Sequence, residues 1–412
     1  MANNNKHTGP NVPALRFPEF SGEWTKDCLN EFLEVQPARN TQGIYSKDDV
    51  LSVSGDYGVV NQIQLLGRSF AGKDVSNYHI VRTNDIVYTK SPLKEFPYGI
   101  VKTNQGTAGI VSTLYAVYSA KSNTDPKFVE YYFSSKERTN KYFKPIVRIG
   151  AKHDMKIGNE EVLRNIVVFP SKQEQNKIQE FLRIIDERIA TQSKIIEELK
   201  TLRGALVNTY INDGNNNNEN QTIMSLGAYG CFVRGLTYSS VDVTDDTATT
   251  GVVRSNNLEY GSPVDIKADL VYVTKKPRPE QMLVNGDIVI CMANGSSSLV
   301  GKASNYQELC RNMTVGAFCG IYRGTHPLTK WIFMSSAYCK AVANAIQGGN
   351  GAIANLHAED ILSMYFAVPS DYKTITELGK LLSLFDKKLH AAEEQLARFI
   401  EQKKYFLFKM FI

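Results

Sequence analysis

One strand, proline and helix pattern occurs twice in the chain, about 200 residues apart. The first copy is "NIVVFPSKQEQNKIQEFLRIIDERI" (165–189), and the second is "MYFAVPSDYKTITELGKLLSLFDKKL" (364–389). Each copy starts as a short apolar strand, meets a proline that interrupts the strand ladder, and continues as a long charged helix. A repeat at a fixed offset constrains the whole architecture, because both copies fold by the same rules.

Four further pairs of segments keep the same order and nearly the same offset. They are "TNDIVYTK" (83–90) with "NGDIVICM" (285–292), "STLYAVY" (112–118) with "GAFCGIY" (316–322), "DPKFVEYYFSS" (125–135) with "HPLTKWIFMSS" (326–336), and "RIGA" (148–151) with "NGA" (350–352). Matches that recur in order predict a duplicated unit, which consists of a globular part of ~150 residues and a long helix.

The globular parts are rich in short strands. Alternating or β-branched runs are separated by Gly, Asn and Asp, as in "VLSVSGDYGVVNQ" (50–62) and "GVVRSNNLEYG" (251–261). Helical segments such as 125–135 are interspersed among these strands. The pattern predicts an α+β fold, with a mixed α/β domain in each half.

The two helices carry a sustained apolar repeat of 3.5 residues, which is typical of a coiled-coil seam. The seam keeps one basic interruption at equivalent positions, Arg203 and Lys403. An alternative is that each helix only covers its own domain. The seam positions in the first helix are Ile178, Leu182, Ile185, Ile189, Gln192, Ile196, Leu199, Arg203 and Leu206, and in the second they are Leu378, Leu382, Phe385, Leu389, Ala392, Leu396, Phe399, Lys403 and Phe406.

The linker length decides the direction of the second helix. The first helix is expected to be ~57 Å long at 1.5 Å per residue. The Asn-rich segment "NDGNNNNENQ" (212–221) reaches at most ~35 Å. We therefore expect an antiparallel helix pair with one globular domain at each end and pseudo-two-fold symmetry. The expected parts are a mobile tail (1–14), a first domain (15–171), a central helix (172–211), the linker (212–221), a second domain (222–370) and a C-terminal helix (371–412).

Composition excludes few functions. The 412 residues carry a formal net charge of +5 and contain 42% hydrophobic residues. This mild basic bias is compatible with a nucleic-acid partner. No apolar run approaches the ~20 residues needed to span a bilayer. The start "MANNNKHTGPN" lacks the apolar core of a secretion signal, so we expect a cytoplasmic protein.

Motifs of catalysis are missing from the sequence. The stretch "GSSSLVGKA" (295–303) resembles a phosphate-binding loop, but five residues separate its glycines and Ala303 stands where a hydroxyl is needed. The scattered histidines and cysteines lack metal-ligand spacing, so no metal site is expected. Neither a dinucleotide-binding pattern around "GGNGA" (348–352) nor a methyltransferase motif occurs. The chain is therefore interpreted as a binding protein, and an enzyme with an unrecognised catalytic site is the alternative.

Two similar but unequal domains at a fixed separation suit double-stranded DNA with two unequal recognition elements. Polar and basic segments are expected to supply contacts to phosphates and base edges. The alternative for any one of these residues is a solvated surface charge. The candidate DNA-binding residues are Lys90, Lys94, Tyr98, Lys102, Arg148 and Lys152 in the first half, and Arg254, Asn256, Lys275, Lys276, Arg278, Asn294, Ser296 and Lys302 in the second.

At this point the chain resembles the specificity (S) subunits of type I restriction-modification systems. The resemblance rests on the duplication and on "PSKQEQNKIQEFLRIIDERI" (170–189), "FDKKL" (385–389), "LRFPEFSGEW" (15–24), "GLTYSSVDV" (235–243) and "GVVRSNNLEYG" (251–261). It implies two target-recognition domains, each reading one half of a bipartite asymmetric DNA sequence. It also implies that the antiparallel two-helix coiled coil between them sets the gap.

The same resemblance implies partners for a chain without a catalytic site or cofactor of its own. These are two modification subunits, which are adenine-N6 methyltransferases using S-adenosylmethionine, and two restriction subunits, which use ATP and Mg. A two-headed protein-binding scaffold is a third possibility. The residues implied to dock the methyltransferase subunits are Glu174, Gln175, Ile178, Leu182, Asp186 and Asp386. The second copy, "SDYKTITELG" (370–379), lacks the Glu-Gln pair of the first.

Overall fold

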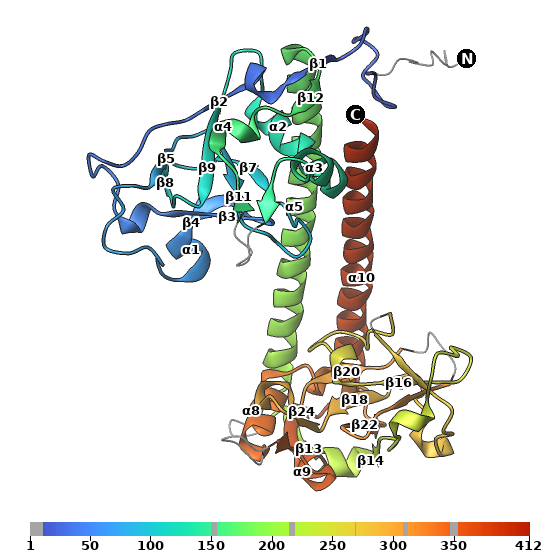
Figure 1. Cartoon of the computed structure of the whole chain (residues 1–412). Coiled ribbons are helices and arrows are strands. Elements are labelled where there is room, and N and C mark those ends of the chain that lie inside the picture. Colours follow the sequence, from blue (N-terminus) through green and yellow to red (C-terminus); the bar gives the residue numbers. More distant parts are fainter. Residues whose placement is uncertain (1–10, 150–154, 214–218, 268, 308–311, 347–352) are drawn as a thin grey trace. The chain divides into compact units, whose positions relative to one another are not determined.

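The computed structural model describes residues 11–149, 155–213, 219–267, 269–307, 312–346 and 353–412. The chain divides into two compact units (Figure 1). Unit 1 comprises Met1–Ser193 with Gln395–Ile412, and unit 2 comprises Lys194–Glu394. Both boundaries fall inside the two long helices, α5 (Lys172–Tyr210) and α10 (Tyr372–Lys409). Each unit therefore contains part of each long helix.

Unit 1 is built on a four-stranded antiparallel sheet in the order β2-β9-β6-β7. A two-stranded pair, β1-β12, leads directly into α5. Its strands are β1 (Thr25–Cys28), β2 (Leu33–Val35), β3 (Leu51–Ser54), β4 (Gly58–Asn61), β5 (His79–Val81), β6 (Ile86–Thr89), β7 (Val101–Thr103), β8 (Gly109–Val111), β9 (Tyr115–Ala120), β10 (Arg148–Ile149), β11 (Met155–Lys156) and β12 (Ile166–Phe169).

Short helices cover the unit 1 sheet and begin where the sequence provides caps. α2 (Pro126–Tyr132) has proline at its first position, and the Asp125 side chain accepts a hydrogen bond from the Phe128 amide at 2.9 Å. α3 (Lys136–Phe143) is capped by Ser135. The remaining short helices of unit 1 are α1 (Gln62–Leu66) and α4 (Asn159–Val162).

Unit 2 repeats this architecture with a four-stranded antiparallel sheet in the order β14-β22-β18-β20. The pair β13-β24 leads into α10 as β1-β12 leads into α5. Its strands are β13 (Gln221–Ser225), β14 (Gly230–Arg234), β15 (Val243–Thr244), β16 (Thr250–Val253), β17 (Val271–Val273), β18 (Ile288–Cys291), β19 (Ala293–Asn294), β20 (Ala303–Asn305), β21 (Met313–Val315), β22 (Cys319–Gly324), β23 (Ala354–Asn355) and β24 (Tyr365–Pro369). Its short helices are α6 (Leu226–Tyr229), α7 (Thr329–Ile332), α8 (Ser336–Ala345) and α9 (Ala358–Ser363).

The long helices pair antiparallel inside each unit. In unit 1 the rings of Phe181 and Phe406 lie 4.8 Å apart, and Asp186 binds Lys403 at 2.5 Å. In unit 2 Lys200 pairs with Glu393 at 3.9 Å, and Arg203 binds Asp386 at 2.7 Å. Higher numbers on α5 face lower numbers on α10 in both cases, so the predicted antiparallel pairing and mixed α/β fold are confirmed.

The helices also cover the globular parts, but each long helix does so in both units, because Val207 of α5 lies in the core of unit 2 and Phe406 of α10 packs against the core of unit 1. Ile178, Leu182 and Ile185 of α5 belong to the core cluster of unit 1, together with Met410 and Phe411 at the end of the chain. Leu378 and Leu382 of α10 belong to the core of unit 2. The apolar seam therefore serves two kinds of burial, against the partner helix and against the sheets.

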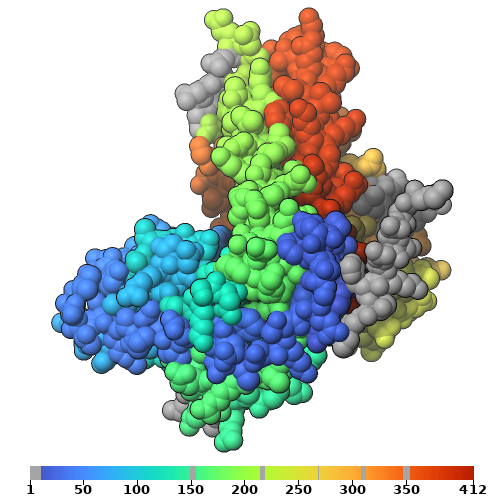
Figure 2. Space-filling model, turned by 90° about the horizontal axis from the view of Figure 1, so that it is seen from above, coloured from blue at the N-terminus to red at the C-terminus, as the bar shows by residue number. Residues whose placement is uncertain are grey.

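The residues before β1 contact both long helices within unit 1. The Leu15 amide donates to the Lys409 carbonyl at 2.9 Å, and Phe17 makes an edge contact with Phe181. In Figure 2 this N-terminal segment (blue) lies against the surface of α5 (green). Within the predicted tail, the Asn11 carbonyl accepts from the Trp24 amide at 2.9 Å, while 1–10 lie outside the described residues, as do 214–218 of the linker. The other predicted domain boundaries stay predictions.

Candidate nucleic-acid interface

A cavity of about 580 Å³ in unit 2 brings polar and aromatic side chains from separate segments together. The short 3-10 helix η4 (Ser255–Asn257), which follows β16, provides one wall, and the turn between β21 and β22 provides another. The lining residues are Tyr238, Arg254, Ser255, Asn256, Asp269, Gly316, Ala317, Phe318 and Cys319. Four of these residues lie in two segments that carried the family resemblance, 235–243 and 251–261.

Backbone hydrogen bonds fix the two walls. The Arg254 amide donates to the buried Asn257 side chain at 2.9 Å, which closes η4. The Gly316 amide donates to the Val253 carbonyl at 2.9 Å, and the Met292 amide donates to the Phe318 carbonyl at 2.8 Å. Phe318 is held by its backbone while its ring stays 65% exposed.

Arg254 is the cation of this cavity. Its Nη2 donates to both the backbone oxygen and the carboxylate of Asp269, each at 3.0 Å. Asn256 donates to the same backbone oxygen at 3.4 Å. Asn294, at the end of β19, donates to the Ser255 hydroxyl at 3.3 Å and accepts from the Ser296 amide at 3.0 Å. The structure thus brings four predicted residues, Arg254, Asn256, Asn294 and Ser296, into one neighbourhood.

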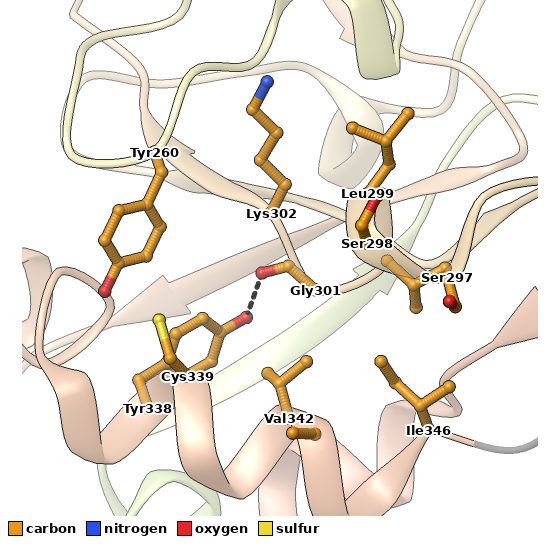
Figure 3. Close-up of a pocket in the computed structure, with 12 residues that line it drawn as sticks. Tyr260, Ser297, Ser298, Leu299, Gly301, Lys302, Tyr338, Cys339, Val342 and Ile346 are labelled. Carbon is orange, nitrogen blue, oxygen red and sulfur yellow. Dashed lines mark hydrogen bonds between the residues drawn. The ribbon is translucent and has the colours of Figure 1, made fainter. Parts of the chain in front are cut away.

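The other predicted residues of unit 2 lie outside this cavity. Lys275 and Lys276 are exposed, and Arg278 pairs with Glu280 at 3.2 Å. Lys302 pairs with Glu259 at 3.2 Å. Lys302 and Gly301 line a separate, mainly apolar pocket of about 380 Å³, in which the Tyr338 hydroxyl donates to the Gly301 carbonyl at 2.8 Å (Figure 3). Their role in DNA binding stays a prediction.

The predicted residues of unit 1 are more dispersed. Lys94 and Arg148 are exposed, and Lys90 donates to the Asn159 side chain at 2.5 Å. Burial and the nearby charges of Arg39 and Lys90 lower the pKa of His79 to about 4, so this histidine is neutral at pH 7. The Tyr98 backbone oxygen accepts from the Tyr88 hydroxyl at 2.7 Å. Lys152 lies outside the described residues.

Lys102 lines an open cleft of about 820 Å³ in unit 1, between the β3-β4 hairpin and the α5-α10 pair. It lies 3.6 Å from Glu130, which also binds Lys127 at 2.8 Å. Lys403 and Lys404 line the same cleft. Sequence reasoning did not select Lys127 or Lys404, because a lone lysine on a helix carries no signal that it faces a cleft.

The residues implied to dock methyltransferase subunits are engaged within the chain itself. Glu174 is 1% exposed and accepts from Arg16 Nε and Nη2, each at 2.7 Å, and from Trp24 Nε1 at 3.3 Å. The buried Gln175 accepts from the Asp125 amide at 2.8 Å. Ile178 and Leu182 are core residues. Their docking role stays a prediction, and a contact with another chain would use exposed neighbours on the same helices.

The two aspartates of this set hold helix contacts. Asp186 accepts from the Tyr131 hydroxyl at 2.8 Å and binds Lys403. Burial and the Asp186 charge raise the pKa of Tyr131, so its hydroxyl stays protonated. Asp386 binds Arg203 and also Lys330. The shared feature of Asp186 and Asp386 is therefore a cation from the facing helix.

Tyr238, Asp269 and Phe318 are among the lining residues of the unit 2 cavity that were not selected from the sequence. Phe318 had a usable signal, since the repeat aligns it with Leu114, and an apolar residue in both copies of a turn is unusual. The sequence carried no such signal for Asp269, because its pairing with Arg254 depends on the path of the loop before β17. In the ranges that the structure describes, no cluster of three or more His, Cys, Asp or Glu side chains could hold a metal ion. Likewise, no described helix is long and apolar enough to cross a membrane.

The fold and the paired helices define the class to which this chain is similar. Its fold is that of the type I restriction-modification S subunit from M. genitalium, with a TM-score of 0.58 at 15% identity over 97% of this chain and 99% of that one. A second solved chain, from work on complex assembly and conformational transition of the type I restriction-modification system, has a TM-score of 0.54 at 13% identity over 94% of this chain and 97% of that chain.

Curated relatives agree with the fold. The chain is 28% identical over 194 residues to the type I restriction enzyme EcoKI specificity subunit of Escherichia coli (strain K12), covering 45% of this chain and 40% of that protein. It is 37% identical over 97 residues to the StySPI specificity subunit of Salmonella potsdam, covering 22% and 20% respectively. The matches thus span less than half of these relatives. No protein-family model matches the chain. The resemblance to type I specificity subunits that the sequence predicted is confirmed.

Proposed function

We propose that the chain is the DNA-recognition subunit of a type I restriction-modification complex. Each unit reads one half of a bipartite, asymmetric DNA target, and the α5-α10 pair sets the gap between the halves. The observation that carries this proposal is the repetition of one strand order, β2-β9-β6-β7 and β14-β22-β18-β20, with different side chains on each copy. Equivalent frames with unequal surfaces suit a ligand with two unequal recognition elements.

The chemistry of the described surface supports a nucleic-acid ligand. The unit 2 cavity combines a guanidinium, the amide of Asn256 and exposed aromatic surface, and a second amide, Asn294, is hydrogen-bonded to Ser255 of its wall. Guanidinium and amide groups contact base edges. Lys275, Lys276 and Arg278 lie on an exposed loop and suit phosphate contacts, which set register without reading sequence.

In this proposal all catalysis is supplied by other subunits. Two modification subunits, adenine-N6 methyltransferases using S-adenosylmethionine, bind the chain, and two restriction subunits contribute ATP- and Mg-dependent translocation and cleavage. The chain itself binds no cofactor and acts in the cytoplasm as part of host defence. The exposed faces of α5 and α10 are the docking surfaces.

A selection experiment tests this function. The full chain, co-expressed with its modification subunit, is incubated with random duplex DNA, and the bound fraction is sequenced. We expect a two-part motif with a fixed gap. Replacing residues 222–370 with the equivalent domain of another specificity subunit should change one half of the motif and leave the other half and the gap unchanged. Absence of a two-part motif would contradict the proposal, and methyl transfer by this chain alone would support the enzyme alternative.

A further inference from the structure

We propose that Arg254 reads a guanine in the half-site that unit 2 contacts, with Asp269 as its positioning residue. This inference rests on the DNA-recognition function proposed above and adds the chemical identity of one base. It starts from the geometry of the cavity beside η4, where Arg254, Asp269 and Phe318 come together.

The backbone of Arg254 is fixed before any ligand binds. Val252 and Val253 of β16 are fully buried, and β16 pairs with both β17 and β21. The Arg254 amide is capped by the Asn257 side chain at 2.9 Å. With the backbone fixed and Nη2 bound to Asp269, the guanidinium is partly positioned before a base binds.

The guanidinium is held at one nitrogen and has an unpaired donor at another, on a side chain that is 35% exposed. Its Nη2 is anchored on Asp269, whereas its Nε is buried and has no hydrogen-bond partner in the parts of the chain that the structure describes. Buried donors in native proteins are nearly always paired, so the unpaired Nε calls for an explanation. A base in the cavity that Arg254 lines would supply an acceptor once the guanidinium shifts toward it. Guanine O6 and N7 present two coplanar acceptors that match the arginine fork.

A purely structural role explains this arrangement poorly. The Asp269 side chain of the pair is 84% exposed, and ion pairs with that exposure contribute little to stability. A phosphate contact is a weaker explanation, because Arg254 lines a cavity with its side chain 35% exposed, whereas Lys275 and Lys276 are exposed and do not line it. The exposed Phe318 at the rim adds apolar surface for a base or a thymine methyl group.

The repeat identifies what unit 1 has at the same place. Val252 bridges Thr314 in parallel in unit 2, and Val50 bridges Ile110 in parallel in unit 1. Two residues further along, Ser52 therefore stands where unit 2 has Arg254. The Ser52 hydroxyl accepts from the Gln62 side chain at 3.1 Å. Unit 1 thus has no guanidinium at this position, which predicts that unit 1 does not read a guanine from it.

The test compares motifs selected by variants of the full chain with its modification subunit. Arg254→Lys keeps the charge and removes the fork, and Arg254→Gln removes both. We expect each variant to lose its preference for guanine at one position, with about 5- to 150-fold weaker binding to the wild-type motif. Asp269→Asn should weaken the guanine preference at that same position without affecting others. Arg278→Ala, on the exposed loop, is the matched control and should weaken binding uniformly.

The outcomes separate this inference from the function on which it rests. If the wild-type complex selects a two-part motif and both Arg254 variants select the same motif with guanine intact, Arg254 is not a base reader. Uniform loss of affinity for all sequences would assign it to a phosphate and overturn the inference. If Arg254→Gln melts at a lower temperature than wild type, the motif selected by Arg254→Lys alone decides whether Arg254 reads the guanine. Absence of any two-part motif for the wild type contradicts the proposed function itself.

Discussion

Units 1 and 2 share a backbone frame and differ in what that frame carries. Strand β6 faces β9 with Ile86 opposite Tyr118 and Val87 opposite Val117. Strand β18 faces β22 in the equivalent register, with Ile288 opposite Tyr322 and Val289 opposite Ile321. The duplication has therefore kept the pairing of the central strands residue by residue.

The same is true of positions that need unusual backbone angles. Asn84 has a φ of 71° and Gly286 a φ of 93°, each in the turn that enters the central strand. An aspartate follows in both copies and accepts from a backbone amide three residues before it, at 2.8 Å for Asp85 and 2.9 Å for Asp287. Gly99 and Gly301 form another such pair, with φ values of 82° and 80°. What is common to both units is thus the set of residues that fixes the chain path.

The units differ most where each long helix begins. In unit 1 the first turn of α5 buries Glu174 against Arg16 and Trp24. The equivalent position in α10 is Thr374, whose amide and hydroxyl donate to the capping Asp371 carboxylate at 2.8 and 2.9 Å. The first turn of the long helix can therefore be stabilised either by a buried ion pair, as in unit 1, or by a local cap, as in unit 2.

The largest expected effect tests the shared frame. A Cβ atom on Gly99 would lie 2.0 Å from the Thr89 backbone oxygen, and one on Gly301 would lie 2.2 Å from Cγ1 of Val342. Gly99→Ala should therefore destabilise unit 1 by about 4 kcal/mol, and Gly301→Ala should destabilise unit 2 by about 2 kcal/mol, since the Val342 side chain can rotate away and a backbone oxygen cannot.

Hydrogen exchange of peptides from β6 and β18 measures each unit separately. Gly72→Ala and Gly295→Ala are the matched controls, because neither glycine has a positive φ and a Cβ on either meets nothing within 4 Å. Equal protection of β6 in wild type and Gly99→Ala would show that the frame is less constrained than the close approach implies.

The next effect tests the difference between the helix starts. Arg16→Ala leaves the Glu174 carboxylate buried with only the Trp24 indole as a partner, and we expect a loss of about 3 kcal/mol from unit 1. Thr374→Ala in unit 2 removes only the hydroxyl contact with Asp371 and keeps the cap bond from the backbone amide, so it should cost less than about 1 kcal/mol. Lys177→Ala, which breaks a nearby exposed pair with Glu19, is the control in unit 1. Urea unfolding, followed by hydrogen exchange in β1 and β13, gives the free energy of unfolding of each unit separately. If Arg16→Ala and Lys177→Ala lowered the stability of unit 1 equally, the buried Arg16–Glu174 pair would contribute no more than an exposed pair.

Much of the frame could be predicted from the sequence because it depends on period and spacing. The paired motifs predicted the duplication, and the 3.5-residue seam predicted the helix pair. The short linker predicted that the two helices run antiparallel. These features depend on local patterns of apolar residues, which are visible in one dimension. The predicted seam is occupied by buried residues such as Ile196 in α5 and Leu389 in α10.

The candidate site was less accessible to such reasoning. Lysine and arginine positions were chosen by residue type, and only some of them share a surface, because loop paths decide which side chains meet. Arg254 and Asp269 are 15 residues apart and meet through a loop with no periodic signal. Glu174 was expected on a docking surface, yet its burial depends on Arg16, which lies 158 residues away. Long-range pairs of this kind are invisible to motif reading.

The smallest expected effect tests a feature in which the two copies exchange roles. Asp186 of α5 binds Lys403 of α10, and Asp386 of α10 binds Arg203 of α5, so a shift of 200 residues turns one pair into the other. We expect a coupling energy of about 1 kcal/mol for the Asp186–Lys403 pair in a double-mutant cycle with Asn and Gln replacements. The Arg203–Asp386 coupling should be weaker, because Lys330 also binds Asp386 and compensates when Arg203 is lost. A stronger coupling in unit 2 than in unit 1 would mean that Lys330 supports the pair instead of replacing it, and that the two helix contacts have diverged in mechanism as well as in sequence.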